Sequence, residues 1–334
     1  MPGKPAMGNV RSVSRTRFRP FAAGDVAAAG VLLAQRHARH RLVRPLLSAR
    51  YEDAAAATAE VAAAFAAPGA SGAFAVRDGE PVGYLLGFPK PGGAWGPNVW
   101  VESAGHAAAD GETLRDLYAV AAAGWAESGL TAHYALVPAT DEELVRAWFR
   151  LGFGQQACHA LRGLPTRAAA VPAGLTIRRA VRDDIPALAE LEVELPRHQR
   201  LAPSFSAAAV PPAEQAAAEW AEDFDDPGYT TFVAERDGAV IGSAVGCALE
   251  KSSSHTGPAR PDNAGFLGFA AVFPSGRGHG AGRALGETVL QWAAQAGFTC
   301  VVTDWRVVNL LSSRTWPALG FEESFLRLHR LIGY

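Results

Sequence analysis

An internal repeat is the feature that most limits what this chain can fold into. Eight residues of the first half recur as the same residue types 159 positions later. They are Arg19, Asp25, Ala28, Arg77, Asp78, Gly79, Gly83 and Gly87, matched by Arg178, Asp184, Ala187, Arg236, Asp237, Gly238, Gly242 and Gly246. A second block recurs 168 positions later, where Gly129, Arg146, Trp148, Leu151, Gly152 and Phe153 are matched by Gly297, Arg314, Trp316, Leu319, Gly320 and Phe321. Ordered matches at Gly, Trp and Phe indicate a duplication, so both halves are expected to share one fold.

The length and composition agree with two globular domains. The chain has 334 residues, of which 49% are apolar and 19% charged, so each half has enough apolar material for a core. We predict a disordered tail over residues 1–13, a first domain over 14–164 and a second domain over 174–334, with a linker between the domains. The loop-like stretch 251–263 (KSSSHTGPARPDN) accounts for the nine-residue change in the repeat offset.

Charge and cysteine content exclude several classes of protein. A net charge of −2 gives no electrostatic support for nucleic-acid binding, and no apolar run approaches the roughly 18–20 residues that span a membrane. Cys158, Cys247 and Cys300 form no CxxC pair or disulfide framework, which predicts a cytoplasmic protein. No His, Asp, Glu or Cys cluster has metal-site spacing, so no metal is expected. The oligomeric state is left open.

The order of predicted elements in the second half is that of a mixed α/β fold of the α+β type. Apolar alternation predicts strands over 175–179, 230–234, 239–248, 265–273, 298–304 and 321–331. Apolar periodicity and capping residues predict helices over 184–195, 212–224, 280–295 and 310–318. A strand, a glycine-rich loop and a helix therefore lie at the centre of this half.

The glycine-rich loop 272–282 (VFPSGRGHGAG) is the candidate site of ligand binding. Alternating glycines let a ligand approach backbone N–H groups, and the following helix adds unpaired N–H groups and a partial positive charge. Such a helix start binds phosphate or pyrophosphate. A glycine-rich turn without a ligand is the plain alternative.

Two other phosphate-binding motifs fit the loop less well. A P-loop needs Lys followed by Ser or Thr, which are missing here. Gly276-x-Gly278-x-x-Ala281 fits a dinucleotide fingerprint loosely, and Asp304 ends the next strand. However, only 52 residues follow Gly282, which is too few for a doubly wound sheet.

Two motifs together resemble the GNAT family of N-acetyltransferases. Arg277-x-x-Gly280-x-Gly282 is similar to that family's R/Q-x-x-G-x-G/A signature. Downstream, Asn309-x-x-Ser312-x-x-x-Trp316 followed by Gly320-Phe321 resembles its N-x-x-A-x-x-x-Y-x-x-x-G-F block. The resemblance covers essentially all of 174–334 and, weakly, 17–164. It implies two tandem GNAT folds, each a mostly antiparallel mixed sheet with a splayed strand pair.

The resemblance also implies acetyl-CoA as co-substrate, held in the second half. The backbone around Ala270, Ala271 and Val272 would hold the pantetheine arm. Residues of the loop and helix start would hold the pyrophosphate, namely Arg277, Gly278, His279, Gly280, Ala281 and Gly282. Asn309, Ser312 and Trp316 would line the cleft.

The first half departs from the motif. At the offset of 168, Arg277, Gly280, Gly282 and Asn309 become Ala109, Glu112, Leu114 and Asp141. Glu112 is expected to repel a diphosphate and Leu114 to crowd it, which predicts a degenerate copy that keeps the fold without the ligand. This arrangement is similar in organisation to mycothiol synthase, whose substrate is not carried over.

The catalytic groups of the second half are less clearly marked. Trp316 stands where many GNAT enzymes have a tyrosine that protonates the leaving thiolate, and an indole N–H is not a usable acid. No carboxylate lies in 265–273, where the family often has a general base. The sequence therefore leaves Asp304 or an ordered water as the base, or an amine that arrives deprotonated. Ser312, acting through a water, is the candidate proton donor.

The resemblance also implies that the acceptor is a primary amine of a small molecule or peptide. Acidic residues gather on the first two predicted helices of the second half and at their ends: Glu190, Glu192, Glu194, Glu219, Glu222, Asp223, Asp225 and Asp226. A solvated acidic face is the plain explanation of these residues. Their potential would also favour a cationic amine or polyamine over an acidic substrate. The rival function is a non-catalytic acyl-CoA-binding sensor or scaffold.

Overall fold

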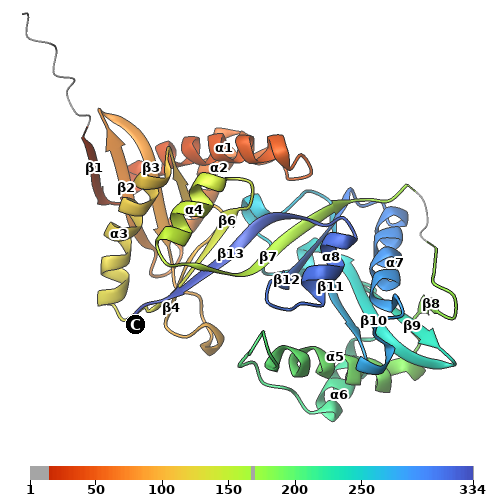
Figure 1. Ribbon diagram of the computed structural model, residues 1–334. Helices are drawn as coiled ribbons and strands as arrows, with labels where there is room; N and C mark the ends of the chain where they lie inside the picture. The colour runs from red at the N-terminus through yellow and green to blue at the C-terminus, as the bar shows by residue number, and fades with distance from the viewer. Residues whose placement is uncertain (1–14, 167–169, 334) are drawn as a thin grey trace, which may run out of the picture.

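The computed structural model describes residues 15–166 and 170–333, and it consists of two α/β halves joined by long strands (Figure 1). The predicted tail over 1–13 lies outside the described residues. Among the described residues, no helix is long and apolar enough to cross a membrane.

Both halves present the same series of elements. The first half contains β1 (Thr16–Pro20), α1 (Val26–Val43), α2 (Ala54–Ala66), β2 (Ser71–Arg77), β3 (Glu80–Gly87), β4 (Asn98–Val101), β5 (His106–Ala108), α3 (Gly111–Glu127), β6 (Ala132–Pro138), α4 (Glu142–Arg150) and β7 (Gly154–Gly163). The second half contains β8 (Thr176–Arg179), α5 (Ile185–Arg200), α6 (Ala213–Asp223), β9 (Tyr229–Arg236), β10 (Ala239–Ala248), β11 (Ala264–Val272), α7 (Ala281–Gln295), β12 (Cys300–Arg306), α8 (Ser312–Ala318) and β13 (Glu322–Leu331). The offset of 168 carries β6 onto β12 and β7 onto β13 without remainder, so the repeat seen in the sequence is also a repeat of structure.

Matched residues of the repeat make matched contacts. Arg19 forms a two-pronged ion pair with Asp25, with N–O distances of 2.6 and 2.5 Å, and Arg178 does the same with Asp184 at 2.7 and 2.9 Å. Each carboxylate also accepts a backbone N–H three residues earlier. These pairs fix the turn between the first strand and the first helix of each half, which explains why both residue types recur.

The last strands of the two halves are exchanged. The nine-stranded sheet has the order β4-β6-β13-β7-β12-β11-β10-β9-β8. β7 of the first half pairs with β12 of the second, and β13 of the second half pairs with β6 of the first, all antiparallel. Figure 1 shows β7 and β13 crossing side by side between the halves. The boundary predicted at 164–174 therefore separates the halves in sequence but not in the sheet.

A further sheet has the order β1-β2-β3-β5 and belongs to the first half. The strand that corresponds to β11 is broken there into β4 and β5, which lie in different sheets. In the second half β11 is continuous and pairs with β10 along its length. The sequence prediction of mixed α/β halves with a splayed strand pair is thus confirmed. The exchange of the last strands between the halves was not predicted.

Helices α7 and α8 pack on one face of the second half's sheet. Leu285, Val289 and Leu290 of α7 share a buried apolar cluster with Val301 and Trp305 of β12. Side chains alternate between the faces of a strand, so Asp304 and Arg306 lie on the opposite face. This alternation divides the residues of β12 between two different surroundings.

Candidate functional site

β11 and β12 separate part-way along their length. The two strands pair in parallel only between Ala264–Phe266 and Cys300–Val302. Beyond this point the hydroxyl of Thr303 donates to the carbonyl oxygen of Leu267 at 2.9 Å, which closes the base of the gap. The rest of β11 remains bonded to β10 alone. The backbone edge of β11 that faces β12 is therefore open to a ligand.

The glycine-rich loop leads directly from this open strand to α7. Gly278 and Gly280 both have φ near +83°, the left-handed region that favours glycine. Gly280 is the N-cap of α7, and no side chain of the described residues caps this end of the helix. The first N–H groups of α7 are therefore available to an anion.

One cavity of about 610 Å³ connects the strand gap with the start of α7. Its walls include most of the cofactor residues predicted from the sequence, namely Ala270, Ala271, Val272, Arg277, Gly278, Gly280, Ala281, Gly282, Asn309, Ser312 and Trp316. Asp304 also lines it. His279 is exposed and does not line the cavity, because it sits on the outer side of the loop.

The side chain of Arg277 is engaged within the protein. Its guanidinium pairs with Glu194 of α5 at 3.0 Å, and its Nε donates to the carbonyl oxygen of Val272 at 3.2 Å. Arg277 thus ties the loop to α5 and to the end of β11. The Arg277 side chain is therefore committed to contacts within the protein, whereas the first N–H groups of α7 have no side-chain cap among the described residues.

Asn309 and Ser312 are held in fixed positions beside the gap. Asn309 is 5% exposed, and its Oδ1 lies 3.3 Å from Nε2 of His198 and accepts the N–H of Leu311 at 3.2 Å. Ser312 Oγ donates to the carbonyl oxygen of Asn309 at 3.2 Å. His198 was not predicted as a site residue, because nothing in the sequence marks α5 as a neighbour of the loop after β12.

The side chain of Trp316 is buried and packed against other side chains. It is 7% exposed and lies edge-on to Phe321 with ring centroids 6.2 Å apart. Its counterpart Trp148 is fully buried and meets Phe153 in the same way at 4.6 Å. The shared contact indicates that this tryptophan serves the fold in both halves.

Asp304 has a buried histidine as its neighbour. The side chain of Asp304 is 36% exposed, and its Oδ2 lies 4.0 Å from Nε2 of His255. Burial lowers the pKa of His255 to about 4, so the ring is neutral at physiological pH. Nδ1 of His255 lies 2.8 Å from Oγ of Ser252. Sequence reasoning missed His255 because it lies in a stretch whose composition indicated only a loop.

The acidic residues that favoured a cationic acceptor are mostly away from the cavity. Of the eight, only Glu194 lines it, and Glu194 is paired with Arg277. Asp225 pairs with Arg182, and Asp226 with Lys251. The cavity wall therefore lacks the group of unpaired acidic side chains on which the expectation of a cationic acceptor depended.

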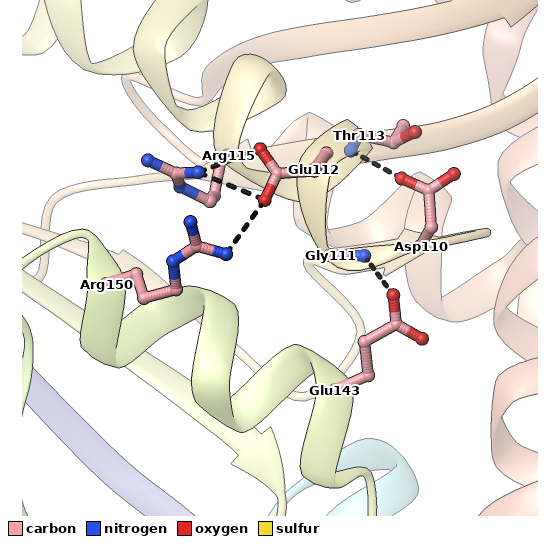
Figure 2. A network of polar contacts seen from close by, with 7 residues as sticks. All are labelled: Asp110, Gly111, Glu112, Thr113, Arg115, Glu143 and Arg150. Atoms are coloured by element: carbon pink, nitrogen blue, oxygen red, sulfur yellow. Dashed lines mark hydrogen bonds and ion pairs between the residues drawn. The ribbon is translucent and has the colours of Figure 1, made fainter.

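The matching helix start in the first half is closed by carboxylates (Figure 2). Asp110 accepts the N–H of Thr113 at 2.7 Å, and Glu143 accepts the N–H of Gly111 at 2.8 Å. The residue expected to repel a phosphate, Glu112, instead points outward and pairs with Arg115 and Arg150. The N–H groups that are free in α7 are thus already bonded in α3.

Comparison with known proteins agrees with this geometry. Residues 194–321 match the model of the acetyltransferase (GNAT) family. A GCN5-related N-acetyltransferase from Sphaerobacter thermophilus is similar over 96% of this chain and 96% of its own, with 16% identity and a TM-score of 0.58. A tandem GNAT protein from the clavulanic acid biosynthesis pathway is similar over 96% of this chain and 99% of its own, with 20% identity and a TM-score of 0.47. No curated protein matches the chain.

The split strand pair and the uncapped, glycine-rich helix start both lie within the residues that match this family. Within the second half, residues 194–321 thus match the acetyltransferase (GNAT) family, and over 96% of its length the chain is similar in fold to a GCN5-related N-acetyltransferase. The likeness in organisation to mycothiol synthase stays a prediction.

Proposed function

We propose that the protein transfers an acetyl group from acetyl-CoA to a primary amine of a small molecule or peptide, and that the chemistry takes place in the second half. The observation that carries the proposal is the single cavity that joins the open edge of β11 to the uncapped start of α7. A thioester of a long, diphosphate-containing carrier requires both features at once.

The residues of the cavity fit such a co-substrate. Free N–H groups of Gly280–Arg283 would hold the pyrophosphate, because a helix start offers donors and partial positive charge. The unpaired backbone of Ala270–Val272 would hold the amide groups of the pantetheine arm. Acetyl-CoA would supply the activated acetyl group as a thioester.

Orientation and backbone donors would supply much of the rate. The cavity brings the acceptor amine and the thioester carbonyl together, which converts a bimolecular step into one within a complex. Backbone N–H groups of β11 stabilise the negative charge that develops on the carbonyl oxygen. Asp304 takes the proton from the amine, directly or through a water. Ser312 passes a proton to the thiolate through a water, a modest task because a thiol has a pKa of about 8.5.

The test is release of free CoA thiol from acetyl-CoA in the presence of a broad panel of amines, with the product identified by mass spectrometry. Turnover that depends on an added amine supports the proposal, and a reaction without amine controls for hydrolysis. CoA binding without transfer to any amine would refute it and favour the acyl-CoA-binding sensor instead. Asp304→Asn should lower kcat by about 10²–10⁴-fold if Asp304 is the base.

A further inference from the structure

The acceptor side of the cavity carries two arginines without ion-pair partners. Arg306 on β12 and Arg327 on β13 both line the cavity. Among the described residues, neither guanidinium has a carboxylate within ion-pair distance. Nε of Arg327 is buried and has no hydrogen-bond partner. A buried N–H donor without a partner is costly, and a nearby ligand acceptor would lower that cost.

The strand exchange brings these two side chains to the same face. Arg306 is the register partner of Ala157 on β7, and Ala157 is the register partner of Arg327 on β13. Residues in register across neighbouring strands share a face of the sheet. Ala157 is buried between them and contributes only a methyl group. Asp304, two residues before Arg306, lies on this face as well.

This face is opposite to the one that holds the start of α7. Trp305 points toward the α7 side and belongs to its buried cluster, so Arg306 and Arg327 point to the other side of the sheet. The guanidinium of Arg327 is also held over the ring of Trp95, 5.4 Å from its centroid. This contact helps to position Arg327 at the wall of the cavity, on the other face of the sheet from the start of α7.

Two guanidinium groups and the Asp304 carboxylate set the charge on this face of the cavity. Burial lowers the pKa of Arg327, while the nearby Asp304 and, more weakly, Glu102 raise it. Glu102 is already paired with Lys90. A second ammonium group on the acceptor would meet two guanidinium groups, whereas a carboxylate would match the planar fork of an arginine.

We propose that Arg327 and Arg306 form a subsite for a carboxylate of the acceptor, so that the substrate is an amine that also carries a carboxylate, as an amino acid does. Its amine then lies toward Asp304 and the thioester, and its carboxylate toward Arg327. This inference rests on the proposed function for its chemistry, but carboxylate binding can be measured without turnover. It replaces the expectation of a cationic acceptor.

The test compares α-amino acids with their decarboxylated amines, for example phenylalanine with phenethylamine, histidine with histamine and lysine with cadaverine. The carboxylated member of a pair should have a kcat/KM at least about tenfold higher, as expected for one charge-assisted contact. Arg327→Gln should remove this preference, lowering kcat/KM for the amino acid about 10- to 100-fold and leaving that of the decarboxylated amine within about twofold. Arg327→Lys, which keeps the charge without the fork, should retain part of the preference.

Arg330→Gln is the matched control, since Arg330 is on the same strand but faces the other way and does not line the cavity. Calorimetry with the same pairs on protein saturated with CoA provides a readout independent of catalysis. Tighter binding of the amino acids that is lost in Arg327→Gln supports the subsite, even if no amine is acetylated and the proposed function fails. If no carboxylated amine binds or reacts better than its partner, or if Arg327→Gln lowers both members equally, the subsite is refuted.

Discussion

Placing a negative charge at the start of α7 is the sharpest perturbation of the proposed CoA site. Gly280 is the N-cap of this helix, with φ of +83° and no side chain of its own. Gly280→Glu adds a carboxylate at the position proposed for the diphosphate. The first half already carries glutamate at the matching position, Glu112.

The expected loss follows from charge and distance. Two unit charges 4 Å apart interact by about 1 kcal/mol in bulk water and by about 4 kcal/mol at the effective dielectric constant of a protein surface. Gly280 is exposed, so we take about 2–4 kcal/mol against the diphosphate, which corresponds to an affinity roughly 30- to 1,000-fold lower. Strain adds a separate cost of about 1–2 kcal/mol for a non-glycine residue in the left-handed region. A Cβ here would also lie 3.0 Å from Cγ of Pro172.

Calorimetry with CoA can separate charge from strain. Gly280→Gln has the same size and the same strain without the charge, so the difference in affinity between the Gln and Glu variants measures electrostatics alone. That difference should shrink at 1 M salt, where the Debye length falls to about 3 Å. Glu112→Gln changes the same charge in the first half and should leave CoA affinity unchanged. If Gly280→Glu binds CoA within about threefold of Gly280→Gln at low salt, the diphosphate is not at this helix start.

Three further predictions concern stability and catalysis. Arg178→Met should lower the free energy of unfolding by about 1–2 kcal/mol at pH 7. The hydrogen bonds from Arg178 lower the pKa of Asp184 in the folded protein. This stabilisation is therefore present above the unfolded pKa of about 3.9 and is lost as the pH falls through the folded pKa. If denaturant unfolding shows the same loss of unfolding free energy in Arg178→Met at pH 3 as at pH 7, the reasoning is contradicted. Trp316→Phe should lower the melting temperature, since the indole is buried, but keep acetyl transfer; complete loss of turnover with unchanged melting and CoA binding would mean a chemical role. Ser312→Ala should lower kcat only about tenfold, less than a true general acid would cost, and a loss above about a thousandfold in steady-state kinetics would refute the water-relay role.

Much of the fold was predictable because the sequence repeats itself. Matched Gly, Trp and Phe residues are constraints of packing and turns, and the structure places them at equivalent points, as with Trp148 and Trp316 beside their phenylalanines. The glycine-rich loop was recognisable for a similar reason. The backbone at Gly278 and Gly280 is left-handed, a conformation that favours glycine, so the loop is visible in the sequence as a cluster of glycines.

The exchange of β7 and β13 could not be predicted from the sequence. Because the two halves are duplicates, each of these strands can pair with the neighbouring strands of either half. When two strands are alike in length and apolar pattern, the sequence does not indicate with which half each strand pairs. Arg327 shows the consequence, because Ala157 of the first half lies between it and Arg306 in the exchanged arrangement. His255 was missed for a different reason, since its meaning comes from the tertiary contact with Asp304 rather than from its neighbours in sequence.

The blocked site of the first half was predicted with the wrong residue. The sequence predicted that Glu112, which matches Gly280 in the repeat, would repel a diphosphate. In the structure Glu112 points outward and pairs with Arg115 and Arg150 (Figure 2). The N–H groups are instead bonded by Asp110 and by Glu143, which reaches α3 from α4. Only the packing of α4 against α3 reveals the second contact.

The stoichiometry of CoA binding to the full chain tests the account most directly. The start of α7 has free N–H groups, whereas that of α3 is capped by two carboxylates, so calorimetric titration should give one CoA per chain. Native mass spectrometry should show the same single adduct, and Gly280→Glu should remove it. Two equivalent sites per chain, or one site that survives in Gly280→Glu, would contradict the assignment of the co-substrate to the second half.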